Sequence, residues 1–259
     1  MPPFRLKAFI VITAFFCAAA AGQGGDRIEF GADSTVTEFI EGGVIKRYTG
    51  NVTARSGDLL LKADEAVYNS VLNMTRLYGG AMLQDSIRTL FADSLIYYDR
   101  RREAVASRNV RGLERSRSFQ AGLVRYLRDN RIIHGRGGVT VRDDSIRSSI
   151  SGMALSFNDS TRDVWVTGAP ALTREDDQGS VITITAADTV RVLRELRTAE
   201  LWKNVEVKKD SMTAKSERAL YEDIPERVTL SGNPVIEHVM RGTGDEDKKI
   251  GRASCRERV

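Results

Sequence analysis

Ala63-Asp64-Glu65-Ala66-Val67-Tyr68 is a short phrase that recurs along this chain of 259 residues and decides its fold. The same order of a small residue, an acid or Gly, an apolar residue and an aromatic returns at Ala92 to Tyr97 and at Ala121 to Tyr126, so that three tyrosines follow one another at intervals of 29 residues. Looser copies occur at Ser151 to Phe157 (one residue longer), Ala187 to Val192 and Ser216 to Tyr221. A fixed period of this length indicates one supersecondary unit stacked on copies of itself.

Within each phrase the residues alternate as they do along a β-strand. Side chains at i, i+2 and i+4 of an extended chain point to the same side, so each phrase has one apolar face. In the fourth copy this face matches only if a bulge absorbs the extra residue. We predict that these apolar faces line the interior, either as a packed core or as a groove, and that they are formed by Ala66, Tyr68, Leu95, Tyr97, Val124, Tyr126, Leu155, Phe157, Val190, Val192, Ala219 and Tyr221.

A polar turn follows each aromatic residue, as at Tyr98-Asp99-Arg100-Arg101, and a second alternating stretch then runs back to a polar corner that often contains Asp-Ser. Each repeat is therefore predicted to be two strands joined by a hairpin turn. Six copies between about residues 44 and 239 predict an all-β protein of a dozen or more strands. The segment from Arg191 to Leu201 also suits a short helix, but the repeat favours strand, turn and strand there.

Both ends of the chain differ from the repeat. Arg5 and Lys7 precede an apolar run and small residues, which is typical of a cleaved signal peptide over residues 1–22. The run is shorter than the roughly 20 residues of a transmembrane helix, although an uncleaved anchor stays an alternative. Residues 240–249 form a polar tail, and residues 250–259 resemble the in-frame translation of a sequencing adapter, with an ordinary basic tail as the alternative.

Composition excludes several classes of function once the ends are set apart. The formal charge of the chain is +4, and each end supplies two positive charges, so residues 23–249 are neutral and do not indicate a nucleic-acid partner. Both cysteines, Cys17 and Cys255, also lie in the ends. We therefore expect a body without disulfides in an oxidising compartment, stabilised by strand ladders and an apolar interior.

The sequence carries no motif for catalysis or metal binding. His134 and His238 each stand without a Cys, His or paired acid at ligand spacing. The acid cluster Glu175-Asp176-Asp177 lacks the nine-residue period of calcium-binding β-rolls. We expect that the protein is not an enzyme and has no cofactor and no metal.

The motifs Gly50-Asn51-Val52, Ala63-Asp64 with Tyr68, and Ala92-Asp93 with Tyr97 resemble the OstA-like family, the periplasmic lipopolysaccharide-transport group that includes LptA and the N-terminal domain of LptD. The resemblance covers about residues 28–239. It implies an open, twisted β-jellyroll that bridges the periplasm and holds lipopolysaccharide acyl chains in its groove. It also implies partners of the same jellyroll type, or further copies of the chain, joined by edge-strand addition, and an association with the outer membrane.

Two alternatives stay open. The chain could be the soluble N-terminal part of a larger outer-membrane lipopolysaccharide-assembly protein, or a structural β-solenoid scaffold with a filled interior. The spacing of the aromatic positions stretches to 31 residues between Tyr126 and Phe157 and to 35 residues between Phe157 and Val192, around an insertion at Glu175 to Gly179. These changes argue against a regular solenoid and leave the register of the middle strands open.

Overall fold

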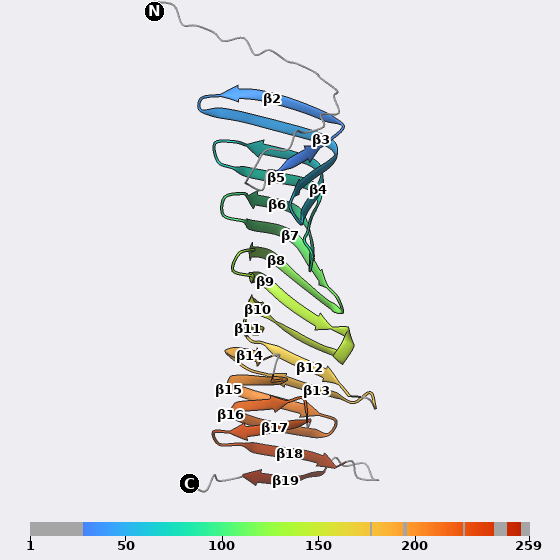
Figure 1. Cartoon of the computed structure of the whole chain (residues 1–259). Coiled ribbons are helices and arrows are strands. Elements are labelled where there is room, and N and C mark those ends of the chain that lie inside the picture. The colour runs from blue at the N-terminus through green and yellow to red at the C-terminus, as the bar shows by residue number, and fades with distance from the viewer. Residues whose placement is uncertain (1–27, 177, 194–195, 225, 241–247, 255–259) are drawn as a thin grey trace, which may run out of the picture. The chain divides into compact units, whose positions relative to one another are not determined.

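The computed structural model describes residues 28–176, 178–193, 196–224, 226–240 and 248–254 (Figure 1). The predicted signal segment lies outside the described residues. The chain forms two compact units: unit 1 contains residues 1–115 and 123–129, and unit 2 contains residues 116–122 and 130–259.

Unit 1 is an antiparallel ladder in which each strand from β2 to β7 pairs with the next one along the chain. The short first strand pairs with the second half of β3, beyond the part that pairs with β2. The strands of unit 1 are β1 (Glu29–Gly31), β2 (Ser34–Ile40), β3 (Gly43–Ser56), β4 (Leu59–Asn69), β5 (Met74–Gln84), β6 (Thr89–Tyr98) and β7 (Glu103–Glu114). The next strand, β8 (Arg117–Leu127), has residues in both units.

Unit 2 is also antiparallel, but several of its long strands are interrupted. A long strand pairs with two shorter ones in succession, as β10 does with β11 and β12 and as β16 does with β17 and β18. The strands are β9 (Ile132–Asp143), β10 (Ser148–Asn158), β11 (Asp163–Thr167), β12 (Ala171–Glu175), β13 (Val181–Thr185), β14 (Thr189–Leu193), β15 (Thr198–Lys209), β16 (Met212–Glu222), β17 (Arg227–Ser231), β18 (Val235–Met240) and β19 (Lys248–Ser254).

The prediction of an all-β, jellyroll-like fold is confirmed. The described residues contain no α-helix, and one 3₁₀ turn over Asp144–Ile146 joins β9 to β10. The segment from Arg191 to Leu201, for which a short helix was the other interpretation, follows the repeat, because β14 ends at Leu193 and β15 begins at Thr198. Strand β19 pairs with β18 and includes residues 250–254, while residues 255–259 lie outside the described part. The predicted domain boundaries and the adapter origin of residues 250–259 stay predictions.

Each sheet bends at pairs of consecutive residues with a left-handed backbone, which Gly and Asn adopt at low cost. The ladder register shifts at these pairs, for example between Thr49 and Val52 of β3. The pairs are Gly50/Asn51, Gly79/Gly80 and Arg108/Asn109 in unit 1, and Gly137/Gly138, Gly168/Ala169, Lys203/Asn204 and Gly232/Asn233 in unit 2. The bends divide each sheet into two arms, so that each unit is a sheet folded over on itself.

The acid of the repeated phrase has a structural role at these bends. Asp93 Oδ2 accepts a hydrogen bond from Asn109 Nδ2 at 2.8 Å, across the ladder from β6 to β7. In the previous repeat, a Cβ added to Gly79 would overlap the carboxylate of Asp64. The acid therefore faces the left-handed pair of the neighbouring strand, an arrangement that the sequence analysis did not predict.

The fourth copy of the phrase fits this scheme without an extra bulge. Met153 occupies the place of Asp64, directly opposite Gly168. The ladder between β9 and β10 shifts register between Gly152 and Ala154, as the other ladders do at the bend. The phrase therefore begins at Gly152 and has the same length as the other copies. The residues that lengthen the repeats of unit 2 lie instead in the breaks between its shorter strands and in turns.

Candidate functional site

The predicted lining residues lie on the inner faces of the arms. The structure divides them between the units, with Ala66, Tyr68, Leu95, Tyr97, Val124 and Tyr126 in unit 1, and Leu155, Phe157, Val190, Val192, Ala219 and Tyr221 in unit 2. All are buried except Tyr68, Leu155 and Val192, which are half-buried. Leu95 and Val190 have no exposed surface, so the inner faces of the arms pack closely in this structure.

The buried interior is larger than the predicted set, which contains only residues of the phrase. The returning strands contribute as many buried apolar side chains. The largest or most deeply buried of these are Val52, Ala54, Leu77, Ala81, Leu83, Ala104, Ala106, Val110, Val166, Leu201 and Val205. Their alternation along each strand is the signal that could have identified them.

Tyrosine hydroxyls mark the edge of the interior of unit 1. Tyr126 donates a hydrogen bond from its hydroxyl to Asp85 Oδ2 at 2.9 Å, and Arg88 Nη1 lies 3.4 Å from the same hydroxyl. Arg88 is buried and pairs through Nε with Glu114 at 2.9 Å. Burial first, and the nearby Asp85 charge second, raise the pKa of Tyr126 to about 12. The hydroxyl therefore stays protonated and donates.

A second contact of the same kind joins the ends of the two arms. Arg128, at the hairpin turn after β8, donates to Asp58 Oδ1 at 2.7 Å in the turn between β3 and β4. The same guanidinium lies 3.3 Å from the Tyr97 hydroxyl. Burial alone would raise the pKa of Asp58, but the charge and hydrogen bond of Arg128 outweigh it and hold that pKa below its ordinary value.

Unit 2 has an equivalent set of contacts. Arg174 Nη1 lies 2.7 Å from Asp223 Oδ1, and Lys209 Nζ lies 3.2 Å from Glu226 Oε1. In both units the residues at the hairpin end of one repeat thus contact residues at the corner end of another. We call these contacts the seam, made of Asp58, Asp85, Arg88, Tyr126 and Arg128 in unit 1 and of Arg174, Lys209, Asp223 and Glu226 in unit 2.

Aromatic side chains close the interior of unit 1 at its first strands. The rings of Phe30 and Tyr48 stack with centroids 4.4 Å apart, and Tyr68 lies 5.7 Å from Phe30. Burial raises the pKa of Tyr48 to about 12, with a further contribution from Tyr68. Tyr68 is half-buried, alone among the four tyrosines of the phrase, and its ring contact in this cluster is the tilted one with Phe30.

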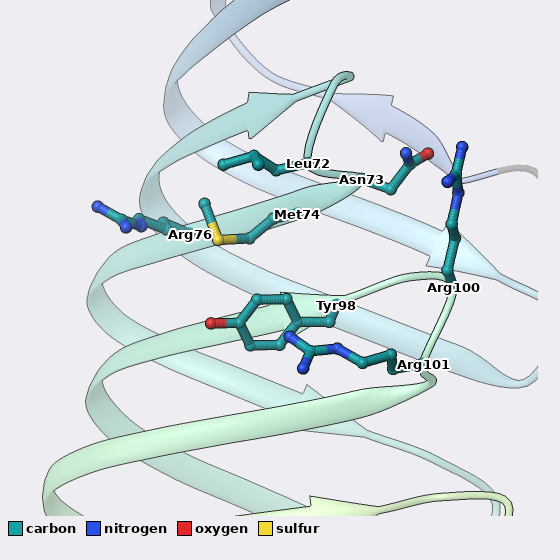
Figure 2. Close-up of a pocket in the computed structure, with 7 residues that line it drawn as sticks. All are labelled: Leu72, Asn73, Met74, Arg76, Tyr98, Arg100 and Arg101. Atoms are coloured by element: carbon teal, nitrogen blue, oxygen red, sulfur yellow. The ribbon is translucent and has the colours of Figure 1, made fainter.

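A shallow pocket lies outside the interior, at the hairpin turns of unit 1 (Figure 2). Leu72 and Met74 form its apolar part, and Arg76, Arg100 and Arg101 surround it. The Arg101 guanidinium stacks on the Tyr98 ring at 4.0 Å from its centroid. The sequence predicts a solvated turn for this arginine run, with contact to lipid phosphate as the lesser alternative.

The described part of the chain holds no group of three or more His, Cys, Asp or Glu side chains that could bind a metal ion. It also holds no helix long and apolar enough to cross a membrane. The site is thus an apolar interior in each unit, bordered by hydroxyls and ion pairs. Such an arrangement suits the binding of apolar chains, because burial of apolar surface is non-directional.

No family model matches the sequence, and no curated protein matches it. Among solved structures, the chain is similar to LptH from Pseudomonas aeruginosa, described as the LptA-homologous periplasmic component of the lipopolysaccharide transport device. The two sequences are 14% identical, the match covers 43% of this chain and 83% of LptH, and the TM-score is 0.39. Because this similarity is weak, we base the function on the residues of the chain itself.

Proposed function

We propose that the protein is a periplasmic lipid carrier that passes lipopolysaccharide toward the outer membrane, with the acyl chains held between the two arms of the folded sheet. The observation that carries this proposal is an apolar interior in each unit that polar side chains border along the seam. An acyl chain would lie among the aliphatic residues, and the polar part of the lipid would remain at the seam.

The residue types of the interior support this proposal. Ala, Val, Leu and Tyr side chains bury apolar surface at about 25 cal/mol per Å² and need no directional bond. An acyl chain of roughly ten or more carbons supplies such surface along its whole length. A carrier must also release its lipid, which many weak contacts permit more readily than a few strong ones.

The packed interior requires that the arms separate before a lipid enters. The seam contacts given by the structure join side chains, such as Arg128 with Asp58 and Arg174 with Asp223. A pair that is half exposed, such as Arg128 with Asp58, contributes only about 0.2–1 kcal/mol, and the less exposed pair of Arg174 with Asp223 contributes about 1–3 kcal/mol. We therefore infer that the arms part along the seam, while the strand ladders stay intact.

Photo-crosslinking in cells tests the proposal with two neighbouring positions. A photoreactive phenylalanine analogue at Tyr126 would face the interior, and the same analogue at Arg125 would face outward, because adjacent strand residues point to opposite faces. We expect lipopolysaccharide adducts from position 126, and from Tyr97 as a second interior position. Adducts from position 125 alone would contradict the interior site.

A structural scaffold is the second candidate, and the close packing of the interior favours it. Leu61, Leu77 and Leu95 have no exposed surface, as expected for a core that never opens. Binding of a fluorescent fatty acid to delipidated protein separates the candidates. A carrier binds the probe and is protected from urea by it, whereas a scaffold does neither. Partners of the same jellyroll type, added at the edge strands, remain part of the proposal.

A further inference from the structure

The hairpin turns of unit 1 form one continuous edge (Figure 1). Ser70 in the β4–β5 turn donates its backbone N–H to Val44 O at 3.0 Å and accepts from Val44 N through its hydroxyl at 2.8 Å. Asp99 in the β6–β7 turn donates its N–H to Asn73 O at 3.0 Å. The β2–β3, β4–β5 and β6–β7 turns therefore lie side by side.

This edge exposes large apolar side chains at its first two turns. Phe39, which pairs with Val44 across the β2–β3 ladder, is 78% exposed, and Leu72 is 60% exposed. They are the two most exposed large apolar side chains in the described part of unit 1, and Val71, which is 49% exposed, lies close to Gly43 at the start of β3. Single exposed apolar residues are ordinary, but apolar residues at adjacent turn tips form a patch.

Basic side chains flank the patch. Arg76, Arg100 and Arg101 are exposed and share the pocket beside Leu72 (Figure 2). Arg101 is held on the Tyr98 ring and lies 3.6 Å from Glu103. Apolar tips bordered by arginines match the two layers of an anionic lipid surface, where the apolar groups enter the acyl boundary and the guanidinium groups meet phosphates.

We propose that this edge, made of Phe39, Val71, Leu72, Arg76, Arg100 and Arg101, docks on the surface of an anionic phospholipid bilayer. The assignment does not depend on a lipid in the interior. It concerns the outer turns and the phospholipids of a membrane surface. Charge complementarity selects the partner, because three arginines line the pocket of Leu72, whereas Ile224, an apolar tip of unit 2 that is 69% exposed, lies beside acids that pair with Arg174, Lys209 and Arg227.

A local probe tests the edge in the full-length chain. In a background with Cys17→Ser and Cys255→Ser, Leu72→Cys is labelled with an environment-sensitive dye, and Ile224→Cys provides the matched position in unit 2. Vesicles contain phosphatidylethanolamine and phosphatidylglycerol at 3:1, or phosphatidylcholine alone. Every variant carries the same residues 1–27, so any membrane affinity of that segment is common to all of them.

We expect the dye at position 72 to shift to the blue with phosphatidylglycerol vesicles and to be quenched by brominated acyl chains, while the dye at 224 is unchanged. Adding Arg100→Glu and Arg101→Glu should weaken the response at 72 about tenfold or more, because each basic residue near an anionic surface contributes about fivefold. Adding Phe39→Ser should weaken it by a similar factor.

Equal responses at 72 and 224, or no response at 72 while the protein sediments with the vesicles, would overturn the assignment. A response at 72 that is the same with phosphatidylcholine would also overturn it, because the arginines would then have no role. The vesicles contain no lipopolysaccharide, and crosslinking from Tyr126 does not involve this edge. The docking proposal and the carrier proposal can therefore fail separately.

Discussion

Unit 1 and unit 2 build the same folded sheet from repeats of different regularity. In unit 1 the left-handed pairs follow one another at intervals of 29 residues, from Gly50 to Gly79 to Arg108, and β3, β5 and β7 run through them without a break. In unit 2 the intervals from Gly137 to Gly168 and from Gly168 to Lys203 are longer, at 31 and 35 residues, and strands stop at two of the bends, where Pro170 and Pro234 follow the left-handed pairs. Proline cannot donate to a ladder, so the sheet bends there by ending one strand and starting another.

The difference shows which part of the repeat the fold requires. The number of residues from the acid position to the left-handed pair is the same in both units: it is 15 from Asp64 to Gly79 and 15 from Asp188 to Lys203. The variable residues lie outside this interval. The bend and the residue facing it therefore form the fixed element, and the lengths of the turns and breaks can change around it.

The largest expected effect comes from the interior. Leu95→Ala in unit 1 and Leu201→Ala in unit 2 remove matched side chains that are 0% and 1% exposed. Each should lower the free energy of unfolding by about 2–5 kcal/mol. Because each unit has its own apolar interior, hydrogen exchange measured by mass spectrometry should rise mainly in the unit that carries the substitution. An equal rise in both units would mean that they unfold as one.

The seam should be stronger in unit 2 than in unit 1. Asp223 is 12% exposed at its pair with Arg174, whereas Asp58 is 50% exposed at its pair with Arg128. Arg174→Gln leaves a nearly buried carboxylate without its cation and should cost about 1–3 kcal/mol. Arg128→Gln leaves Asp58 in contact with water and should cost about 1 kcal/mol or less. Urea unfolding of both variants compares their losses in the free energy of unfolding. A larger loss for Arg128→Gln would contradict the prediction.

The two positions of a bend should tolerate substitution differently. Gly79 has φ +70° and no room for a Cβ beside Asp64, while Gly80 has φ +55° and open space around it. Asn occupies the second position in Asn51 and Asn109, so Gly80→Asn should change stability by less than about 0.5 kcal/mol. Arg108 and Lys203 occupy the first position in other repeats, so the Asp64 side chain has to move aside, and Gly79→Asn should cost about 1 kcal/mol.

Gly138→Asn provides the matched variant in unit 2, where the second position also has open space around it. It should behave as Gly80→Asn does. Thermal unfolding followed by circular dichroism compares the three proteins. If all three lose the same stability, the contact with Asp64 does not distinguish the two positions of the bend.

The sequence predicted the strands and the inward faces because both depend on local alternation. Leu95, Tyr97, Val124 and Tyr126 are buried where the phrase placed them. The relation of Asp93 to Asn109 was accessible in principle, since the 16-residue spacing recurs, but it requires knowledge of the left-handed backbone at the bend.

The seam could not be predicted in the same way. Arg128 and Asp58 are 70 residues apart, and their contact depends on how far each arm bends. No local pattern records that angle. The apolar tips at Phe39 and Leu72 were also missed, because an exposed hydrophobic residue in a strand pattern is indistinguishable in sequence from one that faces the interior.

The smallest expected effect is a loss of stability at acidic pH that arises at the seam of unit 1 and not in the rest of the fold. Arg128 holds the pKa of Asp58 below its value in the unfolded chain, so the ionised carboxylate stabilises unit 1 above about pH 4, and this contribution disappears as the pH falls through the folded-state pKa. Asp58→Asn lacks it at every pH. Between pH 6 and pH 3 the native protein should therefore lose up to about 1 kcal/mol more than Asp58→Asn does. If the two proteins show the same pH dependence in urea unfolding, the contact between Arg128 and Asp58 does not hold the arms together, and the lipid would have to enter elsewhere than at this seam.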